Sequence, residues 1–380
     1  MLRATFICEA TVGHVAFGHR LRRVASARAG LETTWVDISP DEPRVSRTTK
    51  AVERLPPFDR IWTARASLRA REALRASPST PDVLFFHTLA PALLADRWLR
   101  RIPTVISVDA TPINVDEVGA GYGHAASARP IEFVKRQLVR RAFDNASAII
   151  AWSHWVERSL LEDYGVDAAK IVVQAPGVPT DEFQPGARDH DGAVRFLFVG
   201  GDFVRKGGPE LLAAFATLPG HCELDIVTGD AVSAADRIRV HRGLGPGDQE
   251  LRRLYGAADV FVLPTKADTW GHAVVEAMAS GLPVITTGVG ALPEIVDDGA
   301  EGLIVVPGDQ RCLAAAMVRL VDDPARRARL GAAGRHRAVS EFDASVNLAK
   351  FVDDVVTAGN HRDQPDRREA TDDAGAQASP

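Results

Sequence analysis

Two acidic residues, Asp268 and Glu276, are the side chains whose spacing best suits them for chemistry. Asp268 follows the apolar run Val260–Leu263 in a polar loop, and Glu276 lies about one turn inside a short Ala-rich segment that ends at Gly281. A second apolar run begins at Val284, so the pattern predicts a strand, a loop, a helix and a strand. The start of such a helix offers unpaired N–H groups to an anion. This unit therefore predicts a site for a phosphate and the hydroxyls attached to it.

Two adjacent cations, Arg205 and Lys206, lie in the glycine-rich loop 200–208, directly after the predicted strand 195–199. Glycines beside them let the backbone and the cations approach a diphosphate closely. In isolation such a run is most often a solvated turn, but the acidic pair in the same half favours phosphate binding. Glu276 is suited to bind a ribose, because its carboxylate can accept hydrogen bonds from two vicinal hydroxyls. Alternatively, Glu276 forms a salt bridge on the surface of its helix.

The composition indicates a protein of two ordinary globular domains. The chain has 380 residues, 46% of them apolar and 25% charged, and a formal net charge of -5, which argues against a nucleic-acid binder. Its three cysteines are far apart and lack metal-ligand spacing, so we expect reduced thiols. The sequence contains neither a signal-peptide pattern at its start nor a run of about 20 uncharged apolar residues. We therefore expect a soluble, cytoplasmic protein.

Strands and helices alternate along both halves, which is typical of an α/β fold with parallel sheets. The first half is expected to contain a helix over 91–101 and a long irregular loop over 109–129. The two halves are separated by a segment that is rich in Pro and Gly and in which apolar residues show no regular spacing. The expected division is a first domain over 1–180, a linker over 181–192, a second domain over 193–340, a helix over 341–359 that returns to the first domain, and a disordered tail over 360–380.

Several motifs of the second half resemble one known family. They are Arg205-Lys206-Gly207, the segment from Leu254 to Pro264, Asp268-Thr269-Trp270-Gly271, the segment from Val275 to Ile285, and Gly302-Leu-Ile-Val. This half is similar to the donor-binding domain of the retaining glycosyltransferases of family 4, and the motifs cover most of residues 195–340. The first half is similar more loosely. The resemblance implies the GT-B fold, in which two Rossmann-like parallel-sheet domains face a central cleft.

The resemblance also implies an activity: transfer of a sugar from a nucleotide-diphosphate donor to a hydroxyl acceptor with retention of configuration. It implies that the nucleotide sugar is a co-substrate and that the enzyme needs neither a cofactor nor a metal ion. Glu276 would bind the ribose, Arg205 and Lys206 would neutralise the leaving diphosphate, and Asp268 would meet the donor sugar together with Thr269, Trp270 and Gly271. The chain departs from the usual pattern where the sugar is recognised, because Asp268 replaces the commoner Glu and Trp270 the usual Phe.

The first half is expected to supply the acceptor side. Where many relatives have a His after a strand, this chain has Asp109, which could hydrogen-bond the sugar or orient the acceptor. Gly13, next to His14, would let the backbone approach a phosphate or the acceptor. His87 ends another strand at the same edge and is either a site residue or an ordinary loop histidine. Further polar candidates on the long loop are Asn114, Asp116, Tyr122 and His124.

Three alternatives remain open at this point. The basic residues on the predicted helices 60–76 and 130–145 could contact the inner face of a membrane that carries a lipid-linked acceptor, or form a plain solvated face. A nucleotide-sugar epimerase of similar build would need no acceptor. A non-catalytic nucleotide-sugar-binding protein would keep the donor site without the chemistry, and Asp109 in place of His makes this conceivable.

Overall fold

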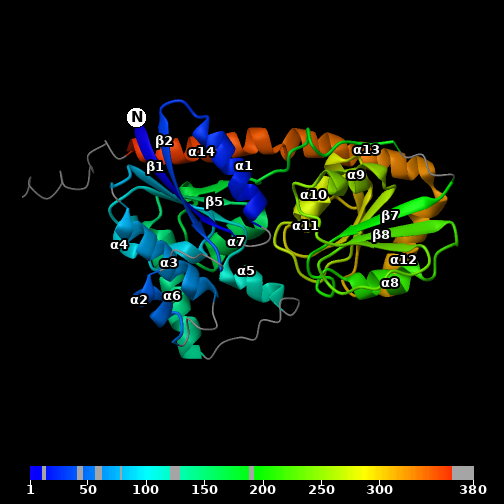
Figure 1. Ribbon diagram of the computed structural model, residues 1–380, viewed down its shortest axis with the longest axis horizontal. Helices are drawn as coiled ribbons and strands as arrows, with labels where there is room; N and C mark the ends of the chain where they lie inside the picture. Colours follow the sequence, from blue (N-terminus) through cyan, green and yellow to red (C-terminus); the bar gives the residue numbers. More distant parts are fainter. Residues whose placement is uncertain are drawn as a thin grey trace, which may run out of the picture.

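The computed structural model describes residues 1–10, 14–40, 46–55, 62–77, 79–119, 129–187 and 192–361. Gly13, Tyr122, His124 and the expected tail beyond residue 361 lie outside these ranges. Two α/β units stand next to each other, and each is built around its own parallel sheet (Figure 1). The fold class expected from the sequence, two Rossmann-like parallel-sheet domains of the GT-B type, is confirmed.

The first sheet has six strands in the order β2-β1-β3-β4-β5-β6. All of its pairs are parallel. The inner strands β3 and β4 are largely apolar runs that are buried throughout, whereas the edge strand β2 carries polar residues and is partly exposed. The strands are β1 (Leu2–Glu9), β2 (Leu31–Ile38), β3 (Val83–Phe86), β4 (Thr104–Val108), β5 (Ala148–Ala151) and β6 (Ile171–Val173).

The helix expected over 91–101 and the loop expected over 109–129 differ in the structure, and α2 was not expected. The helix expected over 91–101 is instead a 3-10 turn, η1 (Ala90–Ala92), and a single turn, α4 (Asp96–Leu99), since no side chain caps the start of either. The loop expected over 109–129 contains α5 (Pro112–Glu117), because Thr111 and Asn114 form a reciprocal capping box. The other helices are α1 (Val15–Ser26), α2 (Arg47–Val52), α3 (Trp62–Ala76), α6 (Arg129–Asn145), α7 (His154–Glu162) and the 3-10 turn η3 (Ala168–Lys170).

The second sheet also has six parallel strands, in the order β12-β11-β10-β7-β8-β9. The expected strand-loop-helix-strand unit around Asp268 is present as β10, α10 and β11. The strands are β7 (Val194–Val199), β8 (Cys222–Val227), β9 (Ile238–His241), β10 (Val260–Leu263), β11 (Val284–Thr287) and β12 (Gly302–Val305). The helices are α8 (Gly208–Phe215), α9 (Gln249–Ala257), α10 (His272–Ala279), α11 (Leu292–Ile295), α12 (Gln310–Asp322) and α13 (Pro324–Glu341).

The helix α14 (Ala344–Asn360) follows α13 and packs on the first sheet, as the red-orange ribbon along the upper edge shows (Figure 1). Its Phe351 meets Phe17 of α1 edge to face, with 5.5 Å between ring centroids. Gly359 lies so close to β1 and β3 that an added Cβ would come within 2.9 Å of Leu2 and 3.2 Å of Val83. A helix late in the sequence thus completes the core of the first unit.

The chain crosses between the two units at two places that are hydrogen-bonded to each other. The N–H of Val178 donates to the carbonyl of Phe342 at 2.8 Å, and the N–H of Ala344 donates back to the carbonyl of Val178 at 2.9 Å. Gly177 has φ +72, and a Cβ there would meet the Phe342 oxygen at 2.7 Å, so the close approach requires glycine. The connection is therefore two-stranded, while the domain limits drawn from the sequence stay a prediction.

Candidate active site

The topology of each sheet indicates where a ligand would bind. In the first sheet the connection after β1 leads to β2 on one side, and the connection after the adjacent β3 leads to β4 on the other. In the second sheet the connections from β7 to β8 and from β10 to β11 diverge in the same way. In open parallel sheets, ligands bind outside the carboxyl ends of strands at such switch points. His14 follows β1 and His87 follows β3 in the first sheet; Lys206 follows β7 and Asp268 follows β10 in the second. The residues predicted from the sequence therefore lie at both switch points.

In the second unit, Lys206 and Asp268 form an ion pair between these two loops, with side chains only 14% and 10% exposed. The loops themselves are in contact, because the N–H of Lys266 donates to the carbonyl of Arg205 at 2.9 Å. Gly207, at φ +80, lies where a Cβ would meet the Pro264 oxygen at 2.1 Å. Only glycine allows this approach, which places the ammonium group next to the carboxylate.

Arg205, the other predicted cation, holds the shape of its loop. Its guanidinium donates to the Asp202 carboxylate at 3.1 Å and to the carbonyl of Ala267 at 2.7 Å. The backbone N–H of Arg205 also donates to Asp202, which together with the guanidinium keeps the pKa of that carboxyl below its usual value. Arg205 therefore links the glycine-rich loop to the loop that carries Asp268.

Glu276 is buried in α10 and accepts a hydrogen bond from the Tyr255 hydroxyl at 3.0 Å. Burial raises the pKa of Glu276 to about 7, against the opposing effects of the Arg20 charge and of the Tyr255 hydrogen bond. Gly271 begins this helix at φ +89, and a Cβ there would come within 2.5 Å of Leu292. The carboxyl is thus held in place and is close to changing its charge near neutral pH.

Aromatic and imidazole rings dominate the first unit's side of the site. His87 is fully buried and stacks on Phe17 with 4.4 Å between ring centroids, and burial lowers its pKa well below the usual value. His14 meets His87 edge-on at 4.9 Å. Nε2 of His14 lies 3.9 Å from Oδ2 of Asp109. His87, a candidate site residue, therefore packs in the core behind His14.

The two units touch at three points near these residues. The Thr269 hydroxyl donates to Oδ2 of Asp109 at 3.2 Å. Both oxygens of Glu294 accept backbone N–H groups at the start of α7, from His154 at 2.7 Å and from Trp155 at 2.6 Å. The ring of Trp152 meets His272 edge-on at 5.8 Å. The predicted residues Asp109 and Thr269, far apart in the sequence, are therefore in direct contact.

Four residues of this region were not predicted from the sequence: Arg20, Tyr255, His272 and Glu294. His272 is the first residue of α10, and burial, followed by the charges of Arg20 and His14, lowers its pKa to about 3. A carboxylate partner for α7 could have been anticipated, because Ser153 marks a helix start with unpaired N–H groups. Which carboxylate takes that place depends on the contact between the units.

Trp270, predicted to bind substrate, is buried and lies edge-on to Phe342, with 5.9 Å between ring centroids. This contact links the Asp268 loop to the second crossing between the units. Its indole nitrogen has no hydrogen-bond partner among the described residues. The role of Trp270 in binding stays a prediction.

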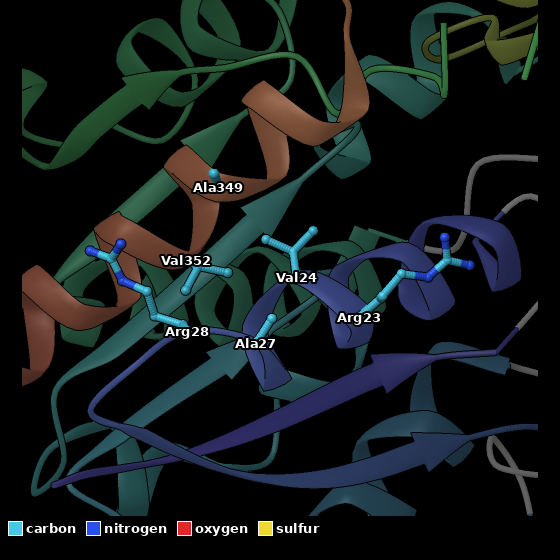
Figure 2. Close-up of a pocket in the computed structure, with 6 residues that line it drawn as sticks. All are labelled: Arg23, Val24, Ala27, Arg28, Ala349 and Val352. Carbon is cyan, nitrogen blue, oxygen red and sulfur yellow. The ribbon is translucent and has the colours of Figure 1, made fainter. Parts of the chain in front are cut away.

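Two hollows lie away from the strand ends. One, of about 390 Å³, lies between α1 and α14, where Val24 and Val352 line its centre and Arg23 and Arg28 stand at opposite ends (Figure 2). The other, of about 330 Å³, lies between α5 and α6 and includes Asp116, a polar candidate from the sequence. None of the residues predicted for catalysis lines either hollow, so we place the candidate site by the strand ends and their contacts.

Comparisons with known proteins identify the family to which the chain belongs. The family model described as Glycosyltransferase Family 4 matches residues 5–182, and the one described as Glycosyl transferases group 1 matches residues 193–323. The glycogen synthase of Mycobacterium tuberculosis is 30% identical over 298 residues, which are 73% of this chain and 69% of that protein. An MMP alpha-(1->4)-mannosyltransferase of Mycolicibacterium hassiacum is 35% identical over 198 residues, 48% of this chain and 47% of that protein.

Solved structures support the fold. Sucrose-phosphate synthase from Thermosynechococcus elongatus superposes with a TM-score of 0.72 at 19% identity, over 94% of this chain and 100% of that one. The Anabaena HepE protein in complex with UDP and glucose superposes with a TM-score of 0.68 at 16% identity, over the same shares of the two chains. The fold and the matching family models thus define a glycosyltransferase of the GT-B class. Within that class, the chain belongs to the family 4 glycosyltransferases.

Two features concern metals and membranes. Within the described residues, no group of three or more His, Cys, Asp or Glu side chains could hold a metal ion. No helix in the same ranges combines the length and apolar character needed to cross a membrane. The expected independence from metals stays a prediction.

Proposed function

We propose that this protein transfers a sugar from a nucleoside-diphosphate sugar to a hydroxyl acceptor with retention of anomeric configuration. The observation that carries the proposal is the Lys206–Asp268 ion pair at the switch point of the second sheet, beside the start of α10. It brings a fixed cation, a carboxylate and a helix N-terminus together at one place. These are the groups that a diphosphate leaving group and a sugar hydroxyl require.

In this mechanism the diphosphate replaces Asp268 as the partner of Lys206, while the N–H groups at the start of α10 bind a phosphate oxygen. Asp268 then becomes free to accept a hydroxyl of the sugar. As the bond from the sugar to the phosphate breaks, the acceptor hydroxyl attacks from the same face and gives its proton to the departing phosphate oxygen. Contact between the two units excludes water and so limits hydrolysis of the donor.

The ribose of the donor binds Glu276. Two hydroxyls that donate to a buried carboxylate favour its charged form, so ligand binding lowers the pKa that burial has raised. One solved protein of the same fold, Anabaena HepE, was crystallised with UDP and with UDP-glucose, which makes a uridine nucleotide the first donor to test. The names of sequence relatives suggest acceptors such as inositol 3-phosphate and glycogen.

The test begins with a thermal-shift screen against UDP, GDP, ADP and their glucose and mannose derivatives. A nucleotide at 100 times its Kd stabilises a protein by about 2.7 kcal/mol. The second step measures donor consumption with and without inositol 3-phosphate, glucose and glycogen, with Lys206→Met as the inactive control. Consumption that depends on an acceptor, with a product of retained configuration, is the expected result.

Other outcomes would replace the proposal. Conversion of the sugar nucleotide into an isomer without any acceptor would indicate an epimerase, for which the comparisons give no support. Tight binding of a sugar nucleotide without turnover on any acceptor would indicate a binding protein. A screen without any stabilising nucleotide would contradict the donor site itself.

The proposal includes a peripheral contact with the inner, cytoplasmic face of a membrane through α6. Phe133 and Val134 are 65% and 57% exposed and stand beside the cations Lys135 and Arg136, an arrangement that suits an anionic lipid surface. On α3, in contrast, Arg69 is buried in an ion pair with Glu53 and serves the fold. Co-sedimentation with phosphatidylglycerol vesicles should decrease for Phe133→Ser, and binding that this change leaves unaltered would rule out the contact.

A further inference from the structure

His272 is the first residue of α10 and lies where the two units meet. Its ring meets Trp152 of the first unit edge-on, with 5.8 Å between ring centroids. Nε2 of His272 is buried and has no hydrogen-bond partner among the described residues. Nearly all buried polar atoms in folded proteins have a partner, so each exception needs an explanation. At a helix start, where backbone N–H groups also lack partners inside the helix, a bound ligand is one such explanation.

Packing against Trp152 does not by itself account for this nitrogen. A contact between an N–H group and an aromatic ring is weak beside a hydrogen bond to an oxygen. An apolar ring at this position would pack against the indole equally well and would bury no polar atom. The nitrogen of His272 is therefore better explained by an acceptor that arrives with a ligand.

The charges around His272 favour an anion as this acceptor. Burial, followed by the charges of Arg20 and His14, lowers the pKa of His272 to about 3. Lys206 acts in the same direction, whereas the carboxylate of Asp268 opposes it. That carboxylate is already paired with Lys206. The ring is thus neutral, can carry its proton on Nε2, and has mainly cationic groups near it.

The position of His272 on α10 indicates which anion it meets. His272 and Glu276 lie one helical turn apart on the same face, a spacing at which Cβ atoms are about 5–6 Å apart. Glu276 is proposed to bind the ribose, and Asp268, in the loop before the helix, to meet the sugar. In a nucleoside-diphosphate sugar the two phosphates connect the ribose to the sugar. A side chain at the start of the helix, between these two carboxylates, therefore faces the phosphate nearer the sugar.

On the basis of the proposed function, we propose that Nε2 of His272 donates a hydrogen bond to the phosphate group next to the transferred sugar. Lys206 neutralises the charge of this group, the N–H groups at the start of α10 bind one of its oxygens, and His272 binds another. Because the ring of His272 packs against Trp152, the phosphate site extends to the boundary with the first unit. His272 touches the group that leaves with the nucleotide and so acts on the reaction directly.

The contribution of His272 should grow as the reaction proceeds. Negative charge accumulates on the leaving phosphate when its bond to the sugar breaks, and a hydrogen-bond donor held in a fixed place stabilises that charge. Hydrogen bonds to charged groups are worth more than neutral ones, so their loss should weaken nucleoside-diphosphate binding by about 10- to 100-fold. The value of kcat should fall by about tenfold or more. A nucleoside monophosphate lacks this phosphate, so its affinity should stay the same.

The experiment compares the mono- and diphosphate of the nucleoside that the thermal-shift screen selects, for example UMP and UDP, on the full chain. Isothermal titration calorimetry gives the two Kd values, and their ratio measures the preference for the diphosphate. His272→Phe keeps a ring against Trp152 but removes the hydrogen-bond donor, so the preference should fall by about 10- to 100-fold. His272→Gln keeps an amide donor and should restore most of it. His221→Phe makes the same exchange at an exposed histidine before β8 and should match the wild type.

The outcomes distinguish this inference from the proposed function. If the wild type binds no nucleotide and transfers no sugar, the proposed function fails and the inference fails with it. If the wild type transfers sugar but His272→Phe keeps the full preference for the diphosphate, only the inference is overturned. The inference is also overturned if His272→Phe weakens both nucleotides equally, because the ring then serves only the shape of the site.

Should His272→Phe not fold, the wild type itself decides. Isotope-labelled histidine allows NMR spectroscopy to follow Nε2 of each imidazole, and the signal that is missing from His272→Gln identifies His272. Addition of UDP should shift this signal to that of a protonated, hydrogen-bonded nitrogen, and addition of UMP should not. A signal that UDP leaves unchanged would refute the proposal.

Discussion

The two sides of the candidate site hold their polar groups in different ways. In the second unit the buried charged groups have partners from that unit: Lys206 pairs with Asp268, and Glu276 accepts from Tyr255. In the first unit, Asp109 accepts a hydrogen bond from the hydroxyl of Thr269, which belongs to the second unit. The side that carries Lys206 and Glu276 is therefore organised before any ligand binds, whereas the other side is completed by contact between the units. Such a division allows donor binding to precede the assembly of the full site.

The largest effect on activity is expected from Lys206→Met, which removes the Lys206–Asp268 ion pair of the second unit. Loss of the cation opposite a leaving diphosphate should lower kcat by about 100- to 1000-fold. It should also lower Tm, because Asp268 becomes a buried charge without a partner. Steady-state kinetics and thermal unfolding measure both effects.

The double variant Lys206→Met/Asp268→Asn provides the matched control. It should recover much of the lost Tm, because no unpaired charge remains, but none of the rate. A double variant with restored kcat would show that the ion pair serves the fold and not the leaving group.

A smaller but still large effect is expected from Glu276→Ala. Loss of a carboxylate that accepts two ribose hydroxyls should weaken nucleoside-diphosphate binding by about 100-fold. Tyr255→Phe removes only the supporting hydroxyl, about 1 kcal/mol, and should weaken binding about fivefold. Isothermal titration calorimetry gives both values. Unchanged affinity in Glu276→Ala would refute the ribose assignment.

The pH dependence of nucleotide binding should be of the order of tenfold. Because the pKa of Glu276 is raised to about 7, the carboxyl is protonated below and charged above that pH. Hydroxyl donors favour the charged form, so affinity should increase by about tenfold from pH 6 to pH 8. The stability of the ligand-free protein should change with pH in the opposite direction. Between pH 4.5 and about 7 the native state binds more protons than the unfolded chain, because the pKa of Glu276 is raised on folding. The contribution of Glu276 to the free energy of unfolding therefore falls as pH rises through that window.

Glu276→Gln is the control for both trends. It should flatten the rise in affinity and remove the opposing change in stability. Calorimetric titrations at pH 6, 7 and 8 decide the first point, and thermal unfolding across the same range decides the second. A variant with the same pH profile as the wild type would assign the titration to another group.

The smallest effect is expected at the junction itself. Glu294→Ala removes the acceptor for two backbone N–H groups at the start of α7, so Tm should fall by a few degrees, equivalent to about 1 kcal/mol. Amide exchange at His154 and Trp155 should become faster. Glu157→Gln, which alters an exposed pair with the His154 ring, serves as the control. Equal exchange in both variants would mean that the Glu294 contact does not persist in solution.

The same contrast explains how far the sequence could predict the molecule. The side that carries Asp268 and Glu276 was predictable because these two residues are close in sequence and because strand, loop and helix patterns place them locally, as β10 and α10 confirm. Its motif glycines are also interpretable: Gly207 and Gly271 adopt positive φ at close contacts. Tyr255 lies inside a quoted motif, but its contact with Glu276 depends on packing between Phe183 and Phe261.

The other side could not be predicted to the same extent. The pairing of Asp109 with Thr269 and the two amides bound by Glu294 join residues from different domains, for which local patterns contain no signal. His87 ends a strand at the expected edge, yet its ring packs in the core. The helix α5 was missed although its signal was present, since Thr111 and Asn114 form a capping box and Pro112 is the first residue of the helix.

The return of α14 to the first sheet has a consequence for the order of folding during synthesis. Phe351 packs against Phe17, and the backbone at Gly359 lies close to Leu2 and Val83, residues that leave the ribosome far earlier. Domains usually fold as they emerge, the first one first. Here the first sheet stays open along one face until the second unit has been made, so the second unit is expected to become the first complete body. The half of the enzyme that is translated first thus finishes folding last.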